Sequence, residues 1–193
     1  MEYVPLGHSD IEVSRICIGG MSFGEPDTSN HEWTISPEDT EKVIKHAFEG
    51  GINYIDTANC YSHGTSEEYI GRALKNLGIL RDEVVLQSKV FFNEGGLSAA
   101  AIAREIDGTL SRLGTDYLDV YMIHRFDYNT PIEETLEALD VLVKAGKVAR
   151  WGLARCSPTS STTCRWLPKR MAGRNSPTCS VTTTCSTVRM NAR

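Results

Sequence analysis

The sequence has no long apolar segment, no secretory leader and no excess of basic residues. No stretch approaches the ~20 apolar residues that a membrane-spanning helix needs. The first residues, 1–5, lack the basic region followed by an apolar region that marks a secretory signal. The formal net charge of −5 argues against nucleic acid as a partner. These absences predict a cytoplasmic protein whose partners include neither a membrane nor a nucleic acid.

Acidic residues are missing from the last part of the chain. Residues 155–193 contain seven Lys or Arg residues but no Asp or Glu, and they also lack Ile, Phe and Tyr. Ser and Thr are abundant there, whereas the preceding residues have the mixed composition of a globular domain. The composition therefore divides the chain into residues 1–153 and a segment of a different kind, residues 154–193.

Short apolar runs recur in the first part at about the spacing of strand–helix units. Such runs are typical of strands that are buried on both faces of a parallel sheet. The runs that we expect to form strands begin near residues 16, 53, 84, 118 and 148.

Helix start and stop signals separate these runs. Ser36-Pro37 predicts the start of a helix, and Gly50-Gly51 predicts its end. Residues 65–68 and 130–133 resemble capping boxes, in which a hydroxyl and a carboxylate cap the first turn reciprocally. Glycine is a common helix stop because it adopts the left-handed conformation easily. The predicted stops of the three later helices are Gly78, Gly114 and Gly146.

Alternating strands and helices predict an α/β fold with a parallel sheet, either an open doubly wound sheet or a (β/α)8 barrel. The first predicted strand is not followed by G-x-G-x-x-G, which weakens the dinucleotide-binding doubly wound alternative. A barrel usually takes about 250 residues, so the first part predicts about five of the eight units of an incomplete barrel. Residues 2–13 are expected to form a β-hairpin that covers the bottom of the barrel.

Four side chains near predicted strand ends are candidates for chemistry. Asp56, Lys89 and His124 follow three successive strands, and Tyr61 lies in the loop after the first of them. Each has a plainer explanation: a capping or structural acid, a solvated lysine, a packed histidine and an ordinary loop tyrosine. Catalytic groups of barrel enzymes, however, come from several strand ends at one face. The joint placement of these four residues therefore favours a catalytic site.

These residue types suit the protonation of a carbonyl group. A phenol with a pKa of ~10 is a poor acid at neutral pH, and a nearby ammonium lowers that pKa. Asp56 would hold Lys89 in place, Lys89 would lower the pKa of Tyr61, and His124 would orient the carbonyl oxygen. Because side chains cannot donate hydride, the reaction would also require a nicotinamide cofactor.

Three segments resemble the aldo-keto reductase family. They are GINYIDTANCY at 51–61 followed by GTSE at 64–67, the lysine of VLQSK at 85–89, and LGTDYLD at 113–119 leading to IHR at 123–125. The resemblance covers residues 6–152 almost continuously, and it is closest to bacterial members related to stress oxidoreductases and channel β-subunits.

The resemblance implies a (β/α)8 barrel that reduces aldehydes or ketones with NADPH. It gives Tyr61 the role of general acid, has Lys89 and Asp56 tune it, and has His124 orient a small-molecule carbonyl substrate. It also implies that Gly20, Met21 and Asp56 line the nicotinamide end of the cofactor site, and it implies no metal. The alternative is a non-catalytic nucleotide-binding barrel that regulates a partner, as channel β-subunits do. The sequence does not predict an oligomeric state.

The resemblance is expected to end at Gly152-Leu153, where the family has Ser or Asn and this chain has Ala154. We interpret residues 154–193 as the product of a shifted reading frame. Pairing the third base of each codon with the first two of the next allows Ser-Ala-Met-Phe-Thr-Tyr-Gln-Phe from Leu153 and Gly-Trp-Pro-Glu-Phe from Met171. Both strings resemble the family sequence after the fifth strand.

Two other interpretations of residues 154–193 remain. The segment could be a natural disordered extension, because it has few large apolar residues. It could also be a zinc or disulfide module, although its four cysteines lack a C-x2-C pair. With a frameshift, residues 154–193 are expected to be non-native and disordered. Because five strands cannot close a barrel, the chain by itself is then expected to be an inactive fragment.

Overall fold

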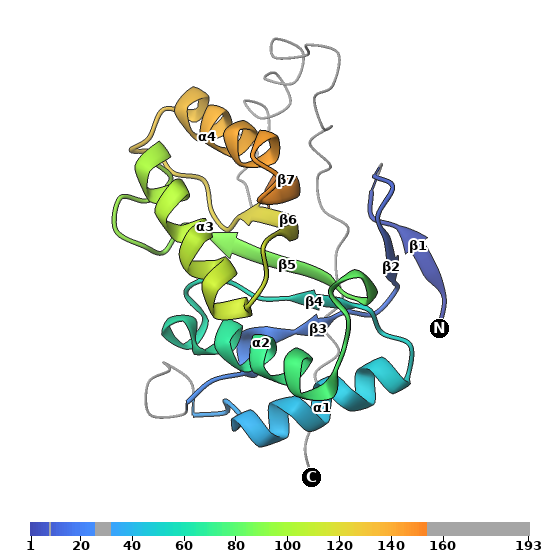
Figure 1. The fold of residues 1–193 in the computed structure, drawn as a ribbon. Helices are drawn as coiled ribbons and strands as arrows, with labels where there is room; N and C mark the ends of the chain where they lie inside the picture. Colours follow the sequence, from blue (N-terminus) through green and yellow to red (C-terminus); the bar gives the residue numbers. More distant parts are fainter. Residues whose placement is uncertain (8, 26–31, 154–193) are drawn as a thin grey trace.

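The computed structural model describes residues 1–7, 9–25 and 32–153, and its main element is a five-stranded parallel sheet. The strand order is β3-β4-β5-β6-β7, so strands that follow one another in the chain are neighbours (Figure 1). The strands are β3 (Ile18–Gly19), β4 (Tyr54–Asp56), β5 (Val85–Val90), β6 (Leu118–Ile123) and β7 (Val148–Leu153). The predicted parallel α/β arrangement is therefore confirmed, and the first strand begins two residues later than expected.

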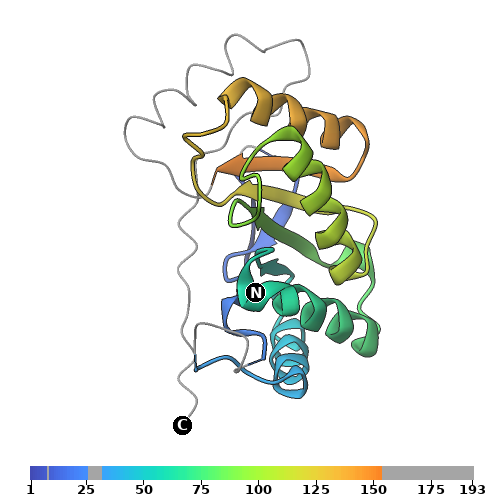
Figure 2. The same cartoon turned by 90° about the vertical axis from the view of Figure 1, so that its left-hand side faces the viewer.

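Four α-helices connect these strands and lie on one side of the sheet, as Figure 2 shows. They are α1 (Pro37–Glu49), α2 (Thr65–Leu77), α3 (Ala99–Leu113) and α4 (Ile132–Lys144). Their apolar stripes pack on the sheet in one continuous core. Its fully buried members include Ile55, Ile70, Leu86, Ile102, Ile106, Leu118 and Leu139.

The helix boundaries confirm most of the sequence signals. Ser36 caps α1, since its hydroxyl accepts a hydrogen bond from the Asp39 N–H at 3.2 Å. Gly78 and Gly114 end α2 and α3 with φ values of 66° and 68°, in the left-handed region that favours glycine. Gly146 (φ 73°) follows Ala145, which is the C-cap of α4.

The two predicted capping boxes are wrong. Thr65 is the first residue of α2, and its hydroxyl donates to the Ser62 carbonyl instead of accepting from the helix. Thr130 lies before the N-cap of α4, which is Pro131, and its hydroxyl donates to the Asp127 carboxylate. In both cases the hydroxyl donates to a group three residues earlier in the chain, so another local hydrogen bond forms in place of the capping box.

A hairpin precedes the sheet. Strands β1 (Tyr3–Pro5) and β2 (Glu12–Ser14) pair antiparallel, as expected. Val13 packs in a small cluster with Tyr54 and Val85, the first residues of β4 and β5. The hairpin therefore covers the amino-terminal end of the strands and leaves their carboxyl-terminal ends for a site.

Three short 3-10 segments complete the described elements: η1 (Gly20–Ser22), η2 (Tyr61–Gly64) and η3 (Arg81–Glu83). Among the described residues, the structure contains no helix with the length and apolar character required to cross a membrane. The expected non-native, disordered segment, residues 154–193, lies outside the described residues.

Candidate active site

The structure brings the four candidate side chains together at the carboxyl-terminal end of the sheet. Asp56 is the last residue of β4, Lys89 the penultimate residue of β5, and His124 follows β6 directly. Tyr61 begins η2, five residues after Asp56. Parallel strands end at the same edge, so three adjacent strand ends and the intervening loop meet there.

Lys89 is the centre of this cluster. Its side chain is 8% exposed, and its Nζ lies 2.6 Å from Asp56 Oδ1, 2.9 Å from the Thr57 carbonyl oxygen and 3.3 Å from the Tyr61 hydroxyl oxygen. An ammonium has three N–H donors, and each of these contacts can use one. The geometry thus satisfies a buried lysine without water.

The Lys89 contacts fix the direction of the Tyr61 hydrogen bond. A charged lysine can only donate, so the Tyr61 oxygen accepts from Lys89. The phenolic hydrogen therefore does not point at Lys89 and can be donated to another acceptor. This is the arrangement that a proton donor requires.

Burial sets the pKa of Tyr61. Desolvation raises the pKa of this phenol, and although Lys89 lowers it as expected, the net pKa lies above the usual value. The expectation of a lowered pKa is therefore wrong for the described residues, because the cost of burying a phenolate exceeds the attraction of the ammonium.

The pKa of Lys89 is raised. Burial, the largest influence, lowers it, but the Asp56 carboxylate and the Tyr61 oxygen together outweigh burial. Lys89 is therefore charged at neutral pH. The Asp56 carboxylate thus opposes the effect of burial and favours the charged form of this ammonium.

His124 stands beside the phenol as a neutral imidazole. Its ring packs edge-on against Tyr61, with centroids 5.8 Å apart. Burial, with the nearby Lys89 charge, lowers its pKa to about 4. The Cys60 Sγ lies 3.9 Å from Nδ1, and burial raises the pKa of this thiol. A thiol that donates to Nδ1 favours the tautomer with hydrogen on Nε2, which leaves an N–H donor for a substrate.

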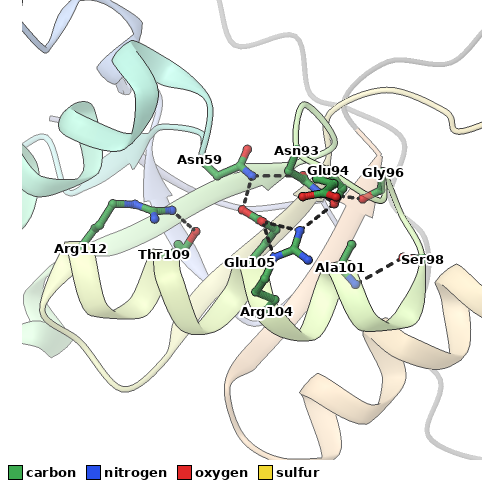
Figure 3. A network of polar contacts seen from close by, with 10 residues as sticks. All are labelled: Asn59, Asn93, Glu94, Gly96, Ser98, Ala101, Arg104, Glu105, Thr109 and Arg112. Carbon is green, nitrogen blue, oxygen red and sulfur yellow. Dashed lines mark hydrogen bonds and ion pairs between the residues drawn. The ribbon is translucent and has the colours of Figure 1, made fainter. Parts of the chain in front are cut away.

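A polar network fastens the loop that carries Tyr61. The Asn59 side-chain amide donates to Asn93 Oδ1 at 3.3 Å and to Glu105 Oε2 at 3.0 Å (Figure 3). Its backbone N–H donates to the Lys89 carbonyl at 3.1 Å. Glu105 also forms an ion pair with the guanidinium of Arg104 at 3.1 Å. The β4–α2 loop is thus attached both to β5 and to α3.

The two residues directly after Tyr61 have a strained backbone. Ser62 and His63 have φ values of 47° and 55°, which are uncommon for residues with a side chain. Ser62 is held by its hydroxyl, which donates to the Phe23 carbonyl at 3.2 Å. Strained residues of this kind persist where tertiary contacts determine the backbone, and they cluster at functional sites.

Gln87 and Tyr54, which the sequence motifs did not indicate, also join the hydrogen bonds of the site. Gln87 Nε2 donates to Asp56 Oδ1 at 2.6 Å, and the Tyr54 hydroxyl donates to Gln87 Oε1 at 2.5 Å. The alternation of β-strands could have indicated both, since Gln87 is two residues from Lys89 and Tyr54 two from Asp56.

The predicted cofactor residues lie in η1 and β4. Gly19 pairs with Asp56, which places Gly20 and Met21 beside the site. A Cβ on Gly20 would lie 2.9 Å from Ser66 Oγ and 3.1 Å from Thr57 Oγ1, so close packing on α2 explains this glycine. Met21 is 42% exposed and offers an apolar surface. Within the described residues, no cluster of His, Cys, Asp and Glu could hold a metal ion.

Comparison with known proteins identifies relatives of this arrangement. The model of the aldo/keto reductase family matches residues 15–175, which extends past Leu153, where the sequence analysis ended the resemblance. Versiconal hemiacetal acetate reductase of Aspergillus parasiticus is 39% identical over 170 residues, covering 76% of this chain and 49% of that protein. A putative voltage-gated potassium channel subunit beta of Schizosaccharomyces pombe is also 39% identical, over 160 residues, covering 79% and 44%.

Solved structures support the same assignment. The holo form of aldo-keto reductase AKR11C1 from Bacillus halodurans superposes with a TM-score of 0.72 at 32% identity, covering 84% of this chain and 53% of that one. The sheet and helices described above are thus part of a (β/α)8 barrel, as expected. The chain spans about half the length of the relatives that it matches. It belongs to the aldo/keto reductase family, whose relatives are oxidoreductases.

Proposed function

We propose that this site catalyses the reduction of aldehydes or ketones to alcohols, with Tyr61 as the proton donor and NADPH as the reductant. The observation that supports this best is the set of Lys89 contacts, which uses all three N–H groups on Asp56, Thr57 and Tyr61. Because the Tyr61 oxygen accepts from Lys89, its own hydrogen is available to a substrate. We place the reaction in the cytoplasm.

The donor set fits a nicotinamide cofactor. The described side chains can polarise and protonate a carbonyl group, but none can supply hydride, which bound NADPH would add to the carbonyl carbon. Gly20, Met21 and Asp56 would hold the nicotinamide end, because they lie side by side where β3 and β4 end. The choice of NADPH over NADH rests on the family resemblance.

The remaining steps belong to the residues of this chain. The Nε2–H of neutral His124 donates to the substrate carbonyl oxygen and orients it. As negative charge develops on that oxygen, Tyr61 transfers its hydroxyl proton to it. Lys89 stabilises the phenolate that remains, and this offsets the burial cost that raises the pKa of Tyr61 at rest. Asp56 keeps the ammonium charged throughout.

The experiment is NADPH oxidation with 4-nitrobenzaldehyde. Tyr61→Phe should lower the rate by roughly 100- to 10,000-fold, the range for loss of a general acid. Tyr128→Phe is the matched control, because that phenol is 77% exposed and should leave the rate unchanged. Equal rates for Tyr61→Phe and the unaltered protein would contradict the assignment of the acid.

We also propose that the 193-residue chain has little activity by itself. The five described strands leave the sheet open at β3 and β7, and an open barrel loses the wall that encloses substrate. The assay is therefore run on the 193-residue chain and on the product of the gene with its reading frame restored after codon 153. Rapid turnover by the 193-residue chain would contradict this part of the proposal.

A second candidate is a nucleotide-binding barrel that regulates a partner without turnover. The similarity to the putative channel subunit of Schizosaccharomyces pombe favours it. The two functions differ in the same assay. NADPH binding, measured by fluorescence quenching, with no Tyr61-dependent oxidation of NADPH would support the regulatory function.

A further inference from the structure

A chain of hydrogen bonds runs along one face of the sheet, from Tyr54 at the start of β4 to Tyr61 at the site. The Tyr54 hydroxyl donates to Gln87 Oε1 at 2.5 Å, Gln87 Nε2 donates to Asp56 Oδ1 at 2.6 Å, and Lys89 Nζ lies 2.6 Å from the same Asp56 oxygen. Tyr61 then accepts from Lys89. The proposed reaction uses Asp56, Lys89 and Tyr61, but it gives no role to Gln87 or Tyr54.

Strand register places these side chains on one face. Tyr54 and Asp56 are two residues apart on β4, and Gln87 and Lys89 are two apart on β5, so each pair points to the same side. Asp56 and Gln87 are register partners across the two strands. The four side chains therefore alternate between strands as the chain of contacts rises towards the site.

The donors and acceptors allow only one direction along this chain. An ionised Asp56 only accepts, so the NH2 group of the Gln87 amide faces it. The amide oxygen then faces Tyr54, whose hydroxyl donates. Tyr54 thereby fixes the orientation of the amide, and it is held between Val13 of the hairpin and Val85.

We propose that Gln87 is a positioning residue that holds the Asp56 carboxylate for Lys89, and that Tyr54 keeps the Gln87 amide in the orientation this requires. Gln87 and Lys89 contact the same oxygen, so Gln87 determines which carboxylate oxygen receives the ammonium. The position of Lys89 in turn sets the direction of the Tyr61 hydrogen bond. The catalytic part of this inference rests on the proposed function, whereas the hydrogen-bond chain does not.

The surroundings of Gln87 make a charge there easy to interpret. Its register partner on β6 is Val120, which has no charge, and its partner on β4 is Asp56. The next side chain in this row is Arg150 of β7, whose guanidinium pairs with Asp10 at 2.9 Å. Lys89 is the cation in direct contact with Asp56, and Tyr54 and Tyr61 are the phenols of the same chain of contacts. A carboxyl group at position 87 would therefore meet one carboxylate directly.

The test is Gln87→Glu, compared with Gln87→Leu, in the full 193-residue chain. A protonated Glu has the shape of Gln, donates to Asp56 and accepts from Tyr54. An ionised Glu would repel Asp56, so the two carboxyls share a proton and the pKa of the pair rises. The folded-state pKa then exceeds the unfolded value of ~4.3, so the stability of Gln87→Glu is retained at low pH and lost as pH rises.

We expect the thermal midpoint of Gln87→Glu to match that of the unaltered chain near pH 4 and to fall below it between about pH 5 and pH 8. Gln87→Leu should be destabilised by a similar amount at every pH. Asn76→Asp is the matched control, because the Asn76 amide donates to Glu41 at 2.8 Å on the exposed surface, where water screens the new charge. Parallel pH profiles for Gln87→Glu and Gln87→Leu would overturn the inference.

The second measurement is catalysis. It is made on the 193-residue chain or on the frame-restored product, depending on which of them shows Tyr61-dependent turnover. Gln87→Glu should retain kcat at low pH and lose it about tenfold or more at high pH with KM unchanged, and Tyr54→Phe should lower kcat at all pH values. A stability profile of the expected form without turnover would support the hydrogen-bond chain and count against the proposed function. An unaltered pH profile of kcat in Gln87→Glu would overturn the positioning role.

Discussion

At the scale of single residues, the site depends on how burial and charge compete. Lys89 is buried, yet its pKa is raised, because Asp56 and Tyr61 together outweigh desolvation. Tyr61 is next to this ammonium, yet burial keeps its pKa above the usual value. In the proposed reaction, Tyr61 therefore keeps its proton until charge develops on a substrate oxygen, when Lys89 would stabilise the phenolate.

His124 should titrate far below an ordinary histidine. Because burial lowers its pKa to about 4, the imidazole is neutral in the folded chain, whereas the unfolded chain binds a proton near pH 6.5. The contribution of His124 to stability is then present above pH 6.5 and is lost as pH falls towards 4. NMR of the imidazole C–H signals of His124 across a pH series should give this midpoint.

Removing one partner of the buried ion pair between α2 and α3 should destabilise the fold. Glu67 is fully buried, accepts from Ser88 Oγ at 2.5 Å and pairs with Arg112 Nε at 2.7 Å. Arg112→Met leaves this buried carboxylate without its cation and should lower the free energy of unfolding by about 3 kcal/mol. Urea denaturation measures this loss. Adding Glu67→Gln should recover part of it.

The control is Arg104→Met. Arg104 pairs with Glu105 at 3.1 Å but is 56% exposed, so its removal should cost no more than about 1 kcal/mol. Equal losses for Arg104→Met and Arg112→Met would show that the pair with Glu67 is not buried as the structure describes.

At the scale of elements, helix ends show which of two local hydrogen-bond patterns forms. The stops at Gly78 and Gly114 follow from the backbone of the residue itself, and the sequence indicated them correctly. The expected capping boxes failed because the Thr65 and Thr130 hydroxyls found partners at Ser62 and Asp127. Both acceptors lie three residues upstream, so each sequence contains two competing local patterns, and only the structure shows which of them forms.

Gly114→Ala should destabilise the fold through the backbone alone. A Cβ there would meet no atom within 4 Å, so the cost comes from the φ value of 68° and should be about 1 kcal/mol. Gly114→Asn is the matched variant, because Asn tolerates the left-handed region and should lose less. Chemical denaturation compares them, and equal losses would contradict the backbone explanation.

At the scale of the whole molecule, the described sheet has two ends that do not meet. β3 and β7 are its outer strands, while the hairpin closes only the amino-terminal side through Val13, Tyr54 and Val85. The cluster of Asp56, Tyr61, Lys89 and His124 lies on the three central strands and their loops. The contacts among these four side chains are thus formed within residues 1–153, and in the proposed function further strands would enclose the substrate.

The frameshift interpretation remains a prediction that the gene can test. The nucleotide sequence after codon 153, read with a one-base shift, should be open and should encode Ser at the first recovered position. Restoring this frame should give a protein with higher resistance to urea than the 193-residue chain. A stop codon in the shifted frame would rule the interpretation out.

The sequence by itself determined the order of strands and helices, most helix boundaries and the four residues of the cluster. These follow from local periodicity, from glycine conformations and from the rule that parallel strands end at one edge. Only the tertiary structure decided the direction of each hydrogen bond, the net pKa of Tyr61 and the contacts of Gln87. The reason is that burial and hydrogen-bond partners come from segments distant in the chain, which no local pattern encodes.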